Sequence, residues 1–226
     1  GIFIVRDDGQ VHLGAYRGAA LEAVTASFPQ PVNATVSGVA IRERHRLGLH
    51  GMHRIYDEME SIEKPIVVAH QGPCVGGGLE LSLSCDFRLA AKSASYAFPE
   101  GKFGVLPASN GVSRLARIIG THWTRYLIMA NLPATADRAL VMGLVHEVFP
   151  DETFDADVMR FCRHLAEQHG EQMGTAKIAI ELAHDVGLAQ ARNVERLANS
   201  ALMLNPDYLA GIERYIKGIG AKGKSD

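Results

Sequence analysis

A strand that runs straight into a glycine turn and a helix constrains this chain more than any other feature. Residues 66–69 are a short apolar run after a proline and predict a buried strand. Gly76, Gly77 and Gly78 follow and open a predicted helix at 79–84. The first N–H groups of a helix lack partners within it, and glycine lets a ligand approach the main chain. Such a turn suits an oxyanion or anion site, and an ordinary tight turn is an equal alternative.

Two familiar nucleotide-binding motifs do not match this turn. No Gly-Lys-Ser/Thr follows the glycines, so the segment is not a phosphate-binding P-loop. The spacing G-x-G-x-x-G is also absent, which argues against a dinucleotide fingerprint.

Strand and helix patterns alternate up to about residue 150, and helical patterns follow to the end. We therefore expect an α/β fold, with a core domain at 1–150 and a helical region at 151–226. The predicted strands outside the glycine segment are 2–6, 10–13, 32–36, 87–91, 96–98 and 145–149. The predicted helices are 18–28, 47–62, 112–119, 122–129, 152–169, 171–186, 188–204 and 207–217, the last beginning next to Pro206.

Composition excludes several classes of protein. The chain has 226 residues, 47% of them hydrophobic, and a net charge of −2, which does not favour nucleic acid as a partner. It has no apolar run long enough to span a membrane and no signal-peptide pattern, so we expect a cytoplasmic protein. Cys74, Cys85 and Cys162 are widely spaced and predict reduced, partly buried thiols. His50 and His53 have no third ligand nearby, so we expect no metal site.

Two carboxylates flank the glycine turn in the sequence. Glu80 falls in the first turn of an otherwise apolar helix, and Glu100 ends the short apolar strand at 96–98. A surface or capping role is the common reading for a single glutamate. Two carboxylates in one pocket, however, can have their pKa values pushed apart so that one acts as a base and the other as an acid.

The same stretch carries a family resemblance. It contains Gly-Gly-Gly-Leu-Glu-Leu-Ser-Leu-Ser-Cys-Asp-Phe-Arg-Leu-Ala, then Phe-Pro-Glu, Phe-Gly-Val-Leu-Pro and Ser-Arg-Leu, and later Ala-Asp-Arg-Ala-Leu-Val-Met-Gly-Leu-Val-His-Glu-Val-Phe. In this order the segments resemble the enoyl-CoA hydratase/isomerase (crotonase) family, continuously over residues 64–150. The resemblance implies a spiral of ββα units, followed by a C-terminal helical region that packs trimers, often paired into hexamers.

The resemblance also implies roles for individual residues. Gly77 resembles the glycine whose N–H binds the thioester oxygen in the oxyanion hole. Glu80 resembles the glutamate that activates water, and Glu100 the glutamate that transfers a proton at C2. Gly76 and Ala108 are then expected to bind substrate, Ala108 through an N–H that helps to hold the water.

The chain departs from the family pattern in three places. A second oxyanion N–H is expected from a loop after the strand at 32–36, but Gly38 runs directly into Val39, and the chain is also short around residues 13–15. We therefore predict that the protein has a loop at each of these two places and that the 226 residues leave both loops out. The stretch Ala-Ser-Asn-Gly at 108–111 alters the rim of the acyl pocket. Lys217 follows Tyr215 one position earlier than a CoA-binding lysine would.

The sequence thus predicts an enoyl-CoA hydratase of fatty acid metabolism. It would add water across the 2,3 double bond of an acyl-CoA, with two glutamates and a backbone oxyanion hole. No cofactor is expected, because coenzyme A arrives with the substrate, and the expected partners are further copies of the chain in a trimer or dimer of trimers. The alternatives are an isomerase, a thioester or C–C hydrolase of the same fold, or a non-catalytic relative.

Overall fold

The computed structural model describes residues 2–5, 11–15 and 49–222. The chain forms two compact units, Gly1–Gly170 and Glu171–Asp226. Helix α7 (Phe154–Ala166) belongs to the first unit because it packs against strands of the main sheet. The division expected at residue 150 therefore falls inside the first unit.

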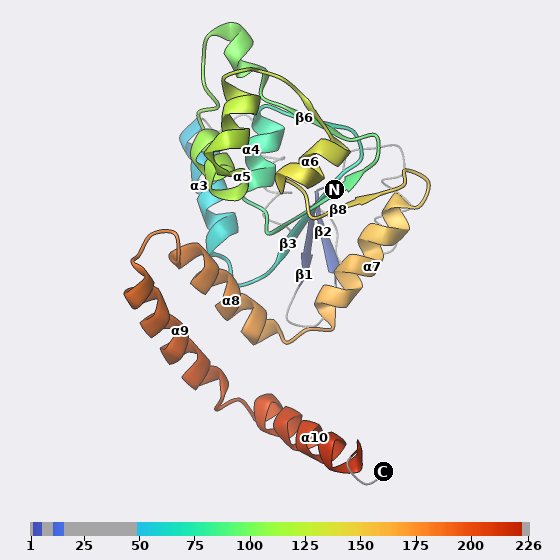
Figure 1. Cartoon of the computed structure of the whole chain (residues 1–226), viewed down its shortest axis with the longest axis vertical. Helices are drawn as coiled ribbons and strands as arrows, with labels where there is room; N and C mark the ends of the chain where they lie inside the picture. Colours follow the sequence, from blue (N-terminus) through green and yellow to red (C-terminus); the bar gives the residue numbers. More distant parts are fainter. Residues whose placement is uncertain (1, 6–10, 16–48, 223–226) are drawn as a thin grey trace. The chain divides into compact units, whose positions relative to one another are not determined.

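A five-stranded sheet forms the centre of the first unit (Figure 1). Its strands are β1 (Ile2–Val5), β2 (Val11–Ala15), β3 (Ile66–His70), β5 (Phe87–Ala91) and β8 (Glu147–Phe149), in the order β2-β1-β3-β5-β8. β1 and β2 pair antiparallel, which confirms the hairpin expected at the start of the chain. β3, β5 and β8 run parallel, and β3 is buried along its whole length.

A second, three-stranded sheet consists of β4 (Pro73–Val75), β6 (Ser95–Ala97) and β7 (Ala134–Thr135). β4 and β6 pair parallel, and β7 runs antiparallel to β6. The chain thus adds β3 to the first sheet and β4 to the second before a helix, and then repeats the pattern with β5 and β6. This is the ββα repeat that the family resemblance implies.

The helices of the first unit follow the predicted pattern with two differences. They are α3 (Leu49–Ser61), α4 (Gly77–Leu83), the 3₁₀ helix η2 (Pro99–Phe103), α5 (Gly111–Ile128), α6 (Ala136–Met142) and α7. The two helices expected at 112–119 and 122–129 are the two halves of α5, which Gly120 separates with a non-helical backbone (φ 71°, ψ 164°). Neither η2 nor α6 was expected from the sequence.

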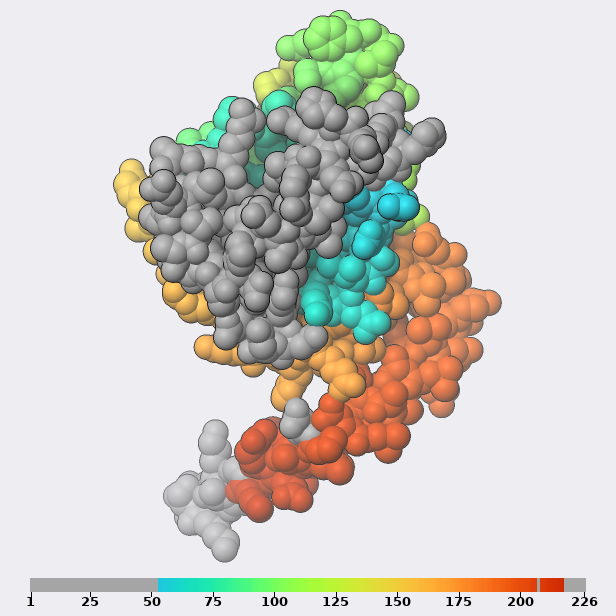
Figure 2. Space-filling model, turned by 180° about the vertical axis from the view of Figure 1, so that it is seen from behind, coloured from blue at the N-terminus to red at the C-terminus, as the bar shows by residue number. Residues whose placement is uncertain are grey.

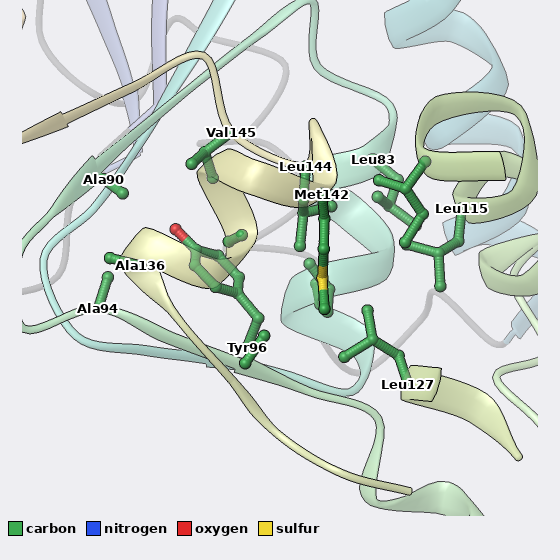
Figure 3. Packing of buried hydrophobic residues seen from close by; sticks show 14 of the residues in the cluster. Leu83, Ala90, Ala94, Tyr96, Leu115, Leu127, Ala136, Met142, Leu144 and Val145 are labelled. Atoms are coloured by element: carbon green, nitrogen blue, oxygen red, sulfur yellow. The ribbon is translucent and has the colours of Figure 1, made fainter. Parts of the chain in front are cut away.

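The main hydrophobic core lies between α4, α5 and α6 and the strands (Figure 3). Tyr96 of β6, Leu115 and Leu127 of α5 and Leu144 after α6 are all completely buried in it. Burial of each such side chain contributes roughly 1.5–3 kcal/mol. A smaller cluster packs Tyr56 and Met59 of α3 against Ile66 and Val68 of β3. These two clusters fix α3, α4 and α5 around the glycine turn.

Three helices form the second unit: α8 (Gly170–Leu182), α9 (Leu188–Leu202) and α10 (Pro206–Lys222). All three were expected from the helical spacing of the sequence, and α10 begins at Pro206 as predicted. Several of their large apolar side chains are exposed, among them Leu188, Leu197, Leu204, Tyr215 and Ile216.

Some sequence expectations lie outside the described residues. These are the helix at 18–28, the strand at 32–36 and the missing loop at Gly38 and Val39. Residues 13–15, where a second loop was expected, lie in β2. Within the described part of the chain, no helix has the length and apolar character needed to cross a membrane.

A histidine at the end of β3 generates a prediction about acid stability. His70 is buried, its Nδ1 lies 3.0 Å from the Tyr96 hydroxyl, and burial lowers its pKa from 6.5 to about 3. In the unfolded chain, His70 is therefore protonated below about pH 6.5, whereas in the folded chain it stays neutral down to about pH 3. Across this window each lower pH unit removes about 1.4 kcal/mol of stability through this group.

The test is urea unfolding of His70→Asn at several pH values from 6.5 to 4.5. Asparagine keeps a polar atom near the Tyr96 hydroxyl but does not titrate. We expect the loss of stability with falling pH to be shallower than in the wild type by about 1 kcal/mol per unit. His122→Asn, at an exposed position, is the control. Equal slopes for His70→Asn and the wild type would show that His70 is protonated normally in the fold.

Candidate active site

The parallel pairing of β4 with β6 places two loops next to each other. Val75, the last residue of β4, pairs with Ala97, the last residue of β6. Because parallel strands end at the same edge of a sheet, the turn after β4 and the segment after β6 leave side by side. The Gly76 N–H confirms this contact by donating to the Ala97 carbonyl oxygen at 3.1 Å. The glycine turn and η2 are therefore neighbours.

Only glycine fits at position 76, for two reasons. Its φ of 53° and ψ of −131° lie in a region that is nearly closed to residues with a Cβ. A Cβ at this position would also lie 2.8 Å from Oε1 of Glu100. Gly77 then begins α4, so its N–H has no partner within the helix, and its carbonyl oxygen accepts a hydrogen bond from the Tyr56 hydroxyl at 3.4 Å.

Glu80 is a buried carboxylate held by the main chain. It lies in the first turn of α4 and is only 5% exposed. Its Oε1 accepts a hydrogen bond from the N–H of Ser109 at 2.7 Å, in the turn that precedes α5. A Cβ at Gly111 would lie 2.7 Å from the same oxygen, so this turn approaches Glu80 closely only because residue 111 is a glycine.

Glu100 lies in η2 with a different environment. Its Oε2 is buried and has no hydrogen-bond partner among the described residues, although buried polar atoms are nearly always paired. Such an atom indicates a place for a proton, a water or a ligand. Asn131 fixes the backbone on both sides of Glu100. In the amide orientation that satisfies its neighbours, the Asn131 nitrogen donates to the Phe98 carbonyl oxygen and its oxygen accepts from the Lys102 N–H, each at 3.0 Å.

Tyr56 places a neutral hydroxyl group next to Gly77 of the turn. Burial, together with the nearby charge of Glu80, raises the pKa of Tyr56 to about 12. The phenol therefore keeps its proton at neutral pH and remains a hydrogen-bond donor to Gly77. A deprotonated phenolate beside a buried carboxylate would be costly.

The structure brings together four of the five residues that the sequence singles out. Gly76, Gly77, Glu80 and Glu100 meet at the beginning of α4. The fifth, Ala108, is exposed and adjoins Ser109 in the turn before α5. Sequence reasoning missed Ser109 itself, because a main-chain donor leaves no signature in the side-chain pattern.

Two further polar residues around the site were also missed. Arg114 lies in the Ser-Arg-Leu segment of the family pattern, and this motif could have marked it as a candidate site residue. Asn131 has no comparable motif. Its φ of 53° is uncommon outside glycine, but that conformation becomes visible only in the fold.

The sequence also singled out histidines, cysteines and a lysine. Among the described residues, no three histidine, cysteine or acidic side chains gather as metal ligands. Cys74 and Cys162 are free thiols, and burial raises the pKa of each to about 12. Lys217, the candidate CoA contact, is exposed on α10 and lies 3.8 Å from the Glu213 carboxylate.

Comparison with known proteins identifies the family of this fold and site. The sequence profile of the enoyl-CoA hydratase/isomerase family matches residues 27–218. The chain therefore belongs to the enoyl-CoA hydratase/isomerase family.

Individual relatives of the chain carry names of the same family, at modest sequence identity. The chain is 30% identical over 191 residues to an enoyl-CoA isomerase/hydratase of Mycosarcoma maydis, covering 79% of this chain and 68% of the relative. It is 26% identical over 213 residues to a crotonyl-CoA hydratase of Syntrophomonas wolfei, covering 94% and 80%.

Solved structures confirm the fold class. An enoyl-CoA hydratase of Bacillus anthracis superposes with a TM-score of 0.72 at 28% identity, over 78% of this chain and 71% of that one. A protein of the same description from Geobacillus kaustophilus gives 0.72 at 26% identity, over 75% of this chain and 65% of that one. The predicted crotonase-like α/β architecture is therefore correct.

The geometry of Gly76 predicts the effect of adding a single methyl group there. Gly76→Ala should destabilise the fold by about 1–3 kcal/mol, because φ is positive and the methyl group meets Glu100. Gly78→Ala, two residues further in α4, is the matched control because no described atom lies within 4 Å of its Cβ. Alanine inside a helix should leave stability unchanged or raise it by about 0.5–1 kcal/mol. Denaturant unfolding of both variants measures the difference, and equal losses would contradict the assignment of strain to Gly76.

Proposed function

We propose that this protein is an enoyl-CoA hydratase, which adds water to the 2,3 double bond of an acyl-CoA thioester. The observation that carries the proposal is the pair of carboxylates at one glycine turn. Glu80 Oε1 is fixed by the Ser109 N–H, while Glu100 Oε2 is buried and unpaired among the described residues. One carboxylate is thus oriented, and the other has an oxygen available for a proton.

The oxyanion hole is assigned to the beginning of α4. As water adds to C3, negative charge develops on the thioester oxygen. The N–H of Gly77 has no partner inside the helix and serves as a donor to that oxygen. A donor of this kind is worth about 2.7–4 kcal/mol of transition-state stabilisation. A second donor would come from the segment around Gly38, which lies outside the described residues.

The proton transfers are divided between the two glutamates. Glu80 accepts a proton from the water as the water oxygen bonds to C3. Glu100, in its acid form, gives a proton to C2, and the double-bond electrons form the new C–H bond. The sum is one water added, and the cycle closes when Glu80 releases its proton to solvent and Glu100 takes one up. No oxidant and no cofactor besides the CoA portion of the substrate takes part. Gly76 and Ala108 are assigned to substrate binding, Ala108 through its N–H.

The names of the relatives support the substrate class. The Syntrophomonas relative is a crotonyl-CoA hydratase and the Mycosarcoma relative an enoyl-CoA isomerase/hydratase. Both act on acyl-CoA thioesters, and we propose the same class for this chain. The second name keeps double-bond isomerisation as the rival, because an isomerase moves one proton between two carbons and needs only one carboxylate. Retention of Glu80 as well as Glu100 favours hydration.

We also propose that the chain assembles as a trimer or a dimer of trimers. Leu188, Leu197 and Leu204 of the second unit are 74–81% exposed. Tyr215 and Ile216 of α10 are exposed as well, and large exposed apolar groups on successive helices are typical of an interface between subunits. Further copies of the same chain are the partner that the family resemblance implies.

The first functional prediction concerns the two glutamates. Glu80→Gln and Glu100→Gln should each lower kcat for hydration of crotonyl-CoA by roughly 10²–10⁴-fold, because each removes a proton-transfer group. The double variant should lose little more than either single one, since both act on one reaction step. Absorbance of the enoyl thioester follows the reaction, and circular dichroism verifies that the variants fold.

The same variants separate hydratase from isomerase. With a 3-enoyl-CoA as substrate, an isomerase would lose activity in Glu100→Gln and keep it in Glu80→Gln. A wild-type protein that leaves crotonyl-CoA and longer 2-enoyl-CoAs untouched would contradict the hydratase proposal.

Oligomerisation gives a second prediction. Light scattering at micromolar concentration should give a mass of three or six chains of 24.4 kDa each. Leu197→Glu places a charge on the exposed face of α9 and should shift the protein toward smaller species. A monomer at that concentration in the wild type would overturn the proposed assembly.

A further inference from the structure

The turn that holds Glu80 is itself held from the other side. Ser109 is 2% exposed, and its N–H donates to Glu80 Oε1. Its carbonyl oxygen accepts a hydrogen bond from Nη1 of Arg114 at 2.9 Å. Both main-chain groups of Ser109 are therefore engaged, one by the carboxylate and one by the guanidinium. The direction of the Ser109 N–H thus depends on where Arg114 lies.

Arg114 is fixed in turn by two acidic residues of α3, whose surface is cyan in Figure 2. Its Nε and Nη2 donate to the two oxygens of Glu60 at 2.5 and 2.8 Å. Nη2 also donates to Oδ1 of Asp57 at 2.7 Å. Although burial acts in the opposite direction, the hydrogen bonds and charges of Glu60 and Asp57 raise the pKa of Arg114 above its ordinary value. The guanidinium is therefore always charged.

The planar guanidinium is suited to this task in a way that an ammonium group is not. Its donors reach one carboxylate with two parallel bonds, a second carboxylate and a carbonyl oxygen at the same time. Lysine carries the same charge at a single point with three rotating donors and cannot reproduce the fork. Arg114 itself is only 7% exposed, so water does not readily replace a bond that its guanidinium loses.

We propose that Arg114 is a positioning residue for Glu80. Anchored to α3 by Glu60 and Asp57, it holds the Ser109 peptide so that its N–H occupies Oε1 of Glu80. The other oxygen of Glu80 is then presented in one direction for the proton of the water. Arg114 does not touch substrate in this scheme and acts only through Ser109 and Glu80. The inference rests on the proposed role of Glu80 as the general base.

The kinetic test uses Arg114→Lys, with Arg125→Lys as a matched control on the exposed side of α5. We expect Arg114→Lys to lower kcat for crotonyl-CoA by roughly 10–100-fold, as small misplacements of catalytic groups do. KM should stay within about twofold, because Arg114 acts through the base and not on the CoA thioester. Arg125→Lys should match the wild type. A rise in KM with unchanged kcat would overturn the proposal.

A double-mutant cycle tests whether the effect passes through Glu80. On the Glu80→Gln background, Arg114→Lys should cause no further loss of kcat, because the group that it positions is gone. An equal loss on both backgrounds would show that Arg114 acts elsewhere. Glu60→Gln provides a milder variant, which loosens the anchor on α3 but keeps Arg114. It should move kcat in the same direction by a smaller factor.

Hydrogen–deuterium exchange provides a readout that does not depend on activity. In Arg114→Lys, the amide of Ser109 should exchange at least about tenfold faster, while amides in the middle of α5 keep their wild-type rates. Unchanged exchange at Ser109 would overturn the inference even if kcat fell. A protein inactive toward every acyl-CoA would defeat the proposed function, and the exchange of Ser109 would still decide whether Arg114 holds the turn.

Discussion

The parallel pairing of β4 with β6 is the contact on which the candidate site depends. It brings the ends of both strands to one edge, so that the Gly76 turn and the η2 segment emerge together. Three residues pair in each strand, which is too little to be stable alone. The fully buried side chain of Tyr96 anchors β6 in the main core. Packing of the core therefore sets the overall position of the site, and local hydrogen bonds set the final positions of its side chains.

The elements that sequence reasoning predicted are those whose signal is local. β5 lies at the predicted 87–91, because its apolar run is buried and bounded on both sides. The glycine turn could be predicted because three consecutive glycines are a local signal, and in the structure Gly76 has a positive φ while Gly77 and Gly78 form the beginning of α4. α6 was missed because seven residues are too few for a helical period to stand out. The family resemblance supplied the roles of Glu80 and Glu100, which composition and spacing alone left open.

The parts of the site that the sequence did not predict are contacts over long separations. The Ser109 N–H reaches Glu80 across 29 residues, and Arg114 reaches Glu60 across 54. Such contacts arise because α4 packs on α5 and Arg114 reaches α3, and they follow from no periodicity. A main-chain donor has no residue type, so nothing marks Ser109 in advance. Arg114 was marked only as a member of a motif, without a partner to explain it.

The two carboxylates differ in what holds them, and the proposed division of base and acid roles rests on this difference. Glu80 is oriented by a main-chain donor whose own position is fixed by a buried, permanently charged guanidinium. A base that removes a proton from a small water molecule needs such a fixed direction, because water brings few contacts of its own. Glu100 is held through the backbone on either side of it by Asn131, while its Oε2 has no partner among the described residues. In the proposed hydration, this unbonded oxygen is the one that would deliver the proton to C2.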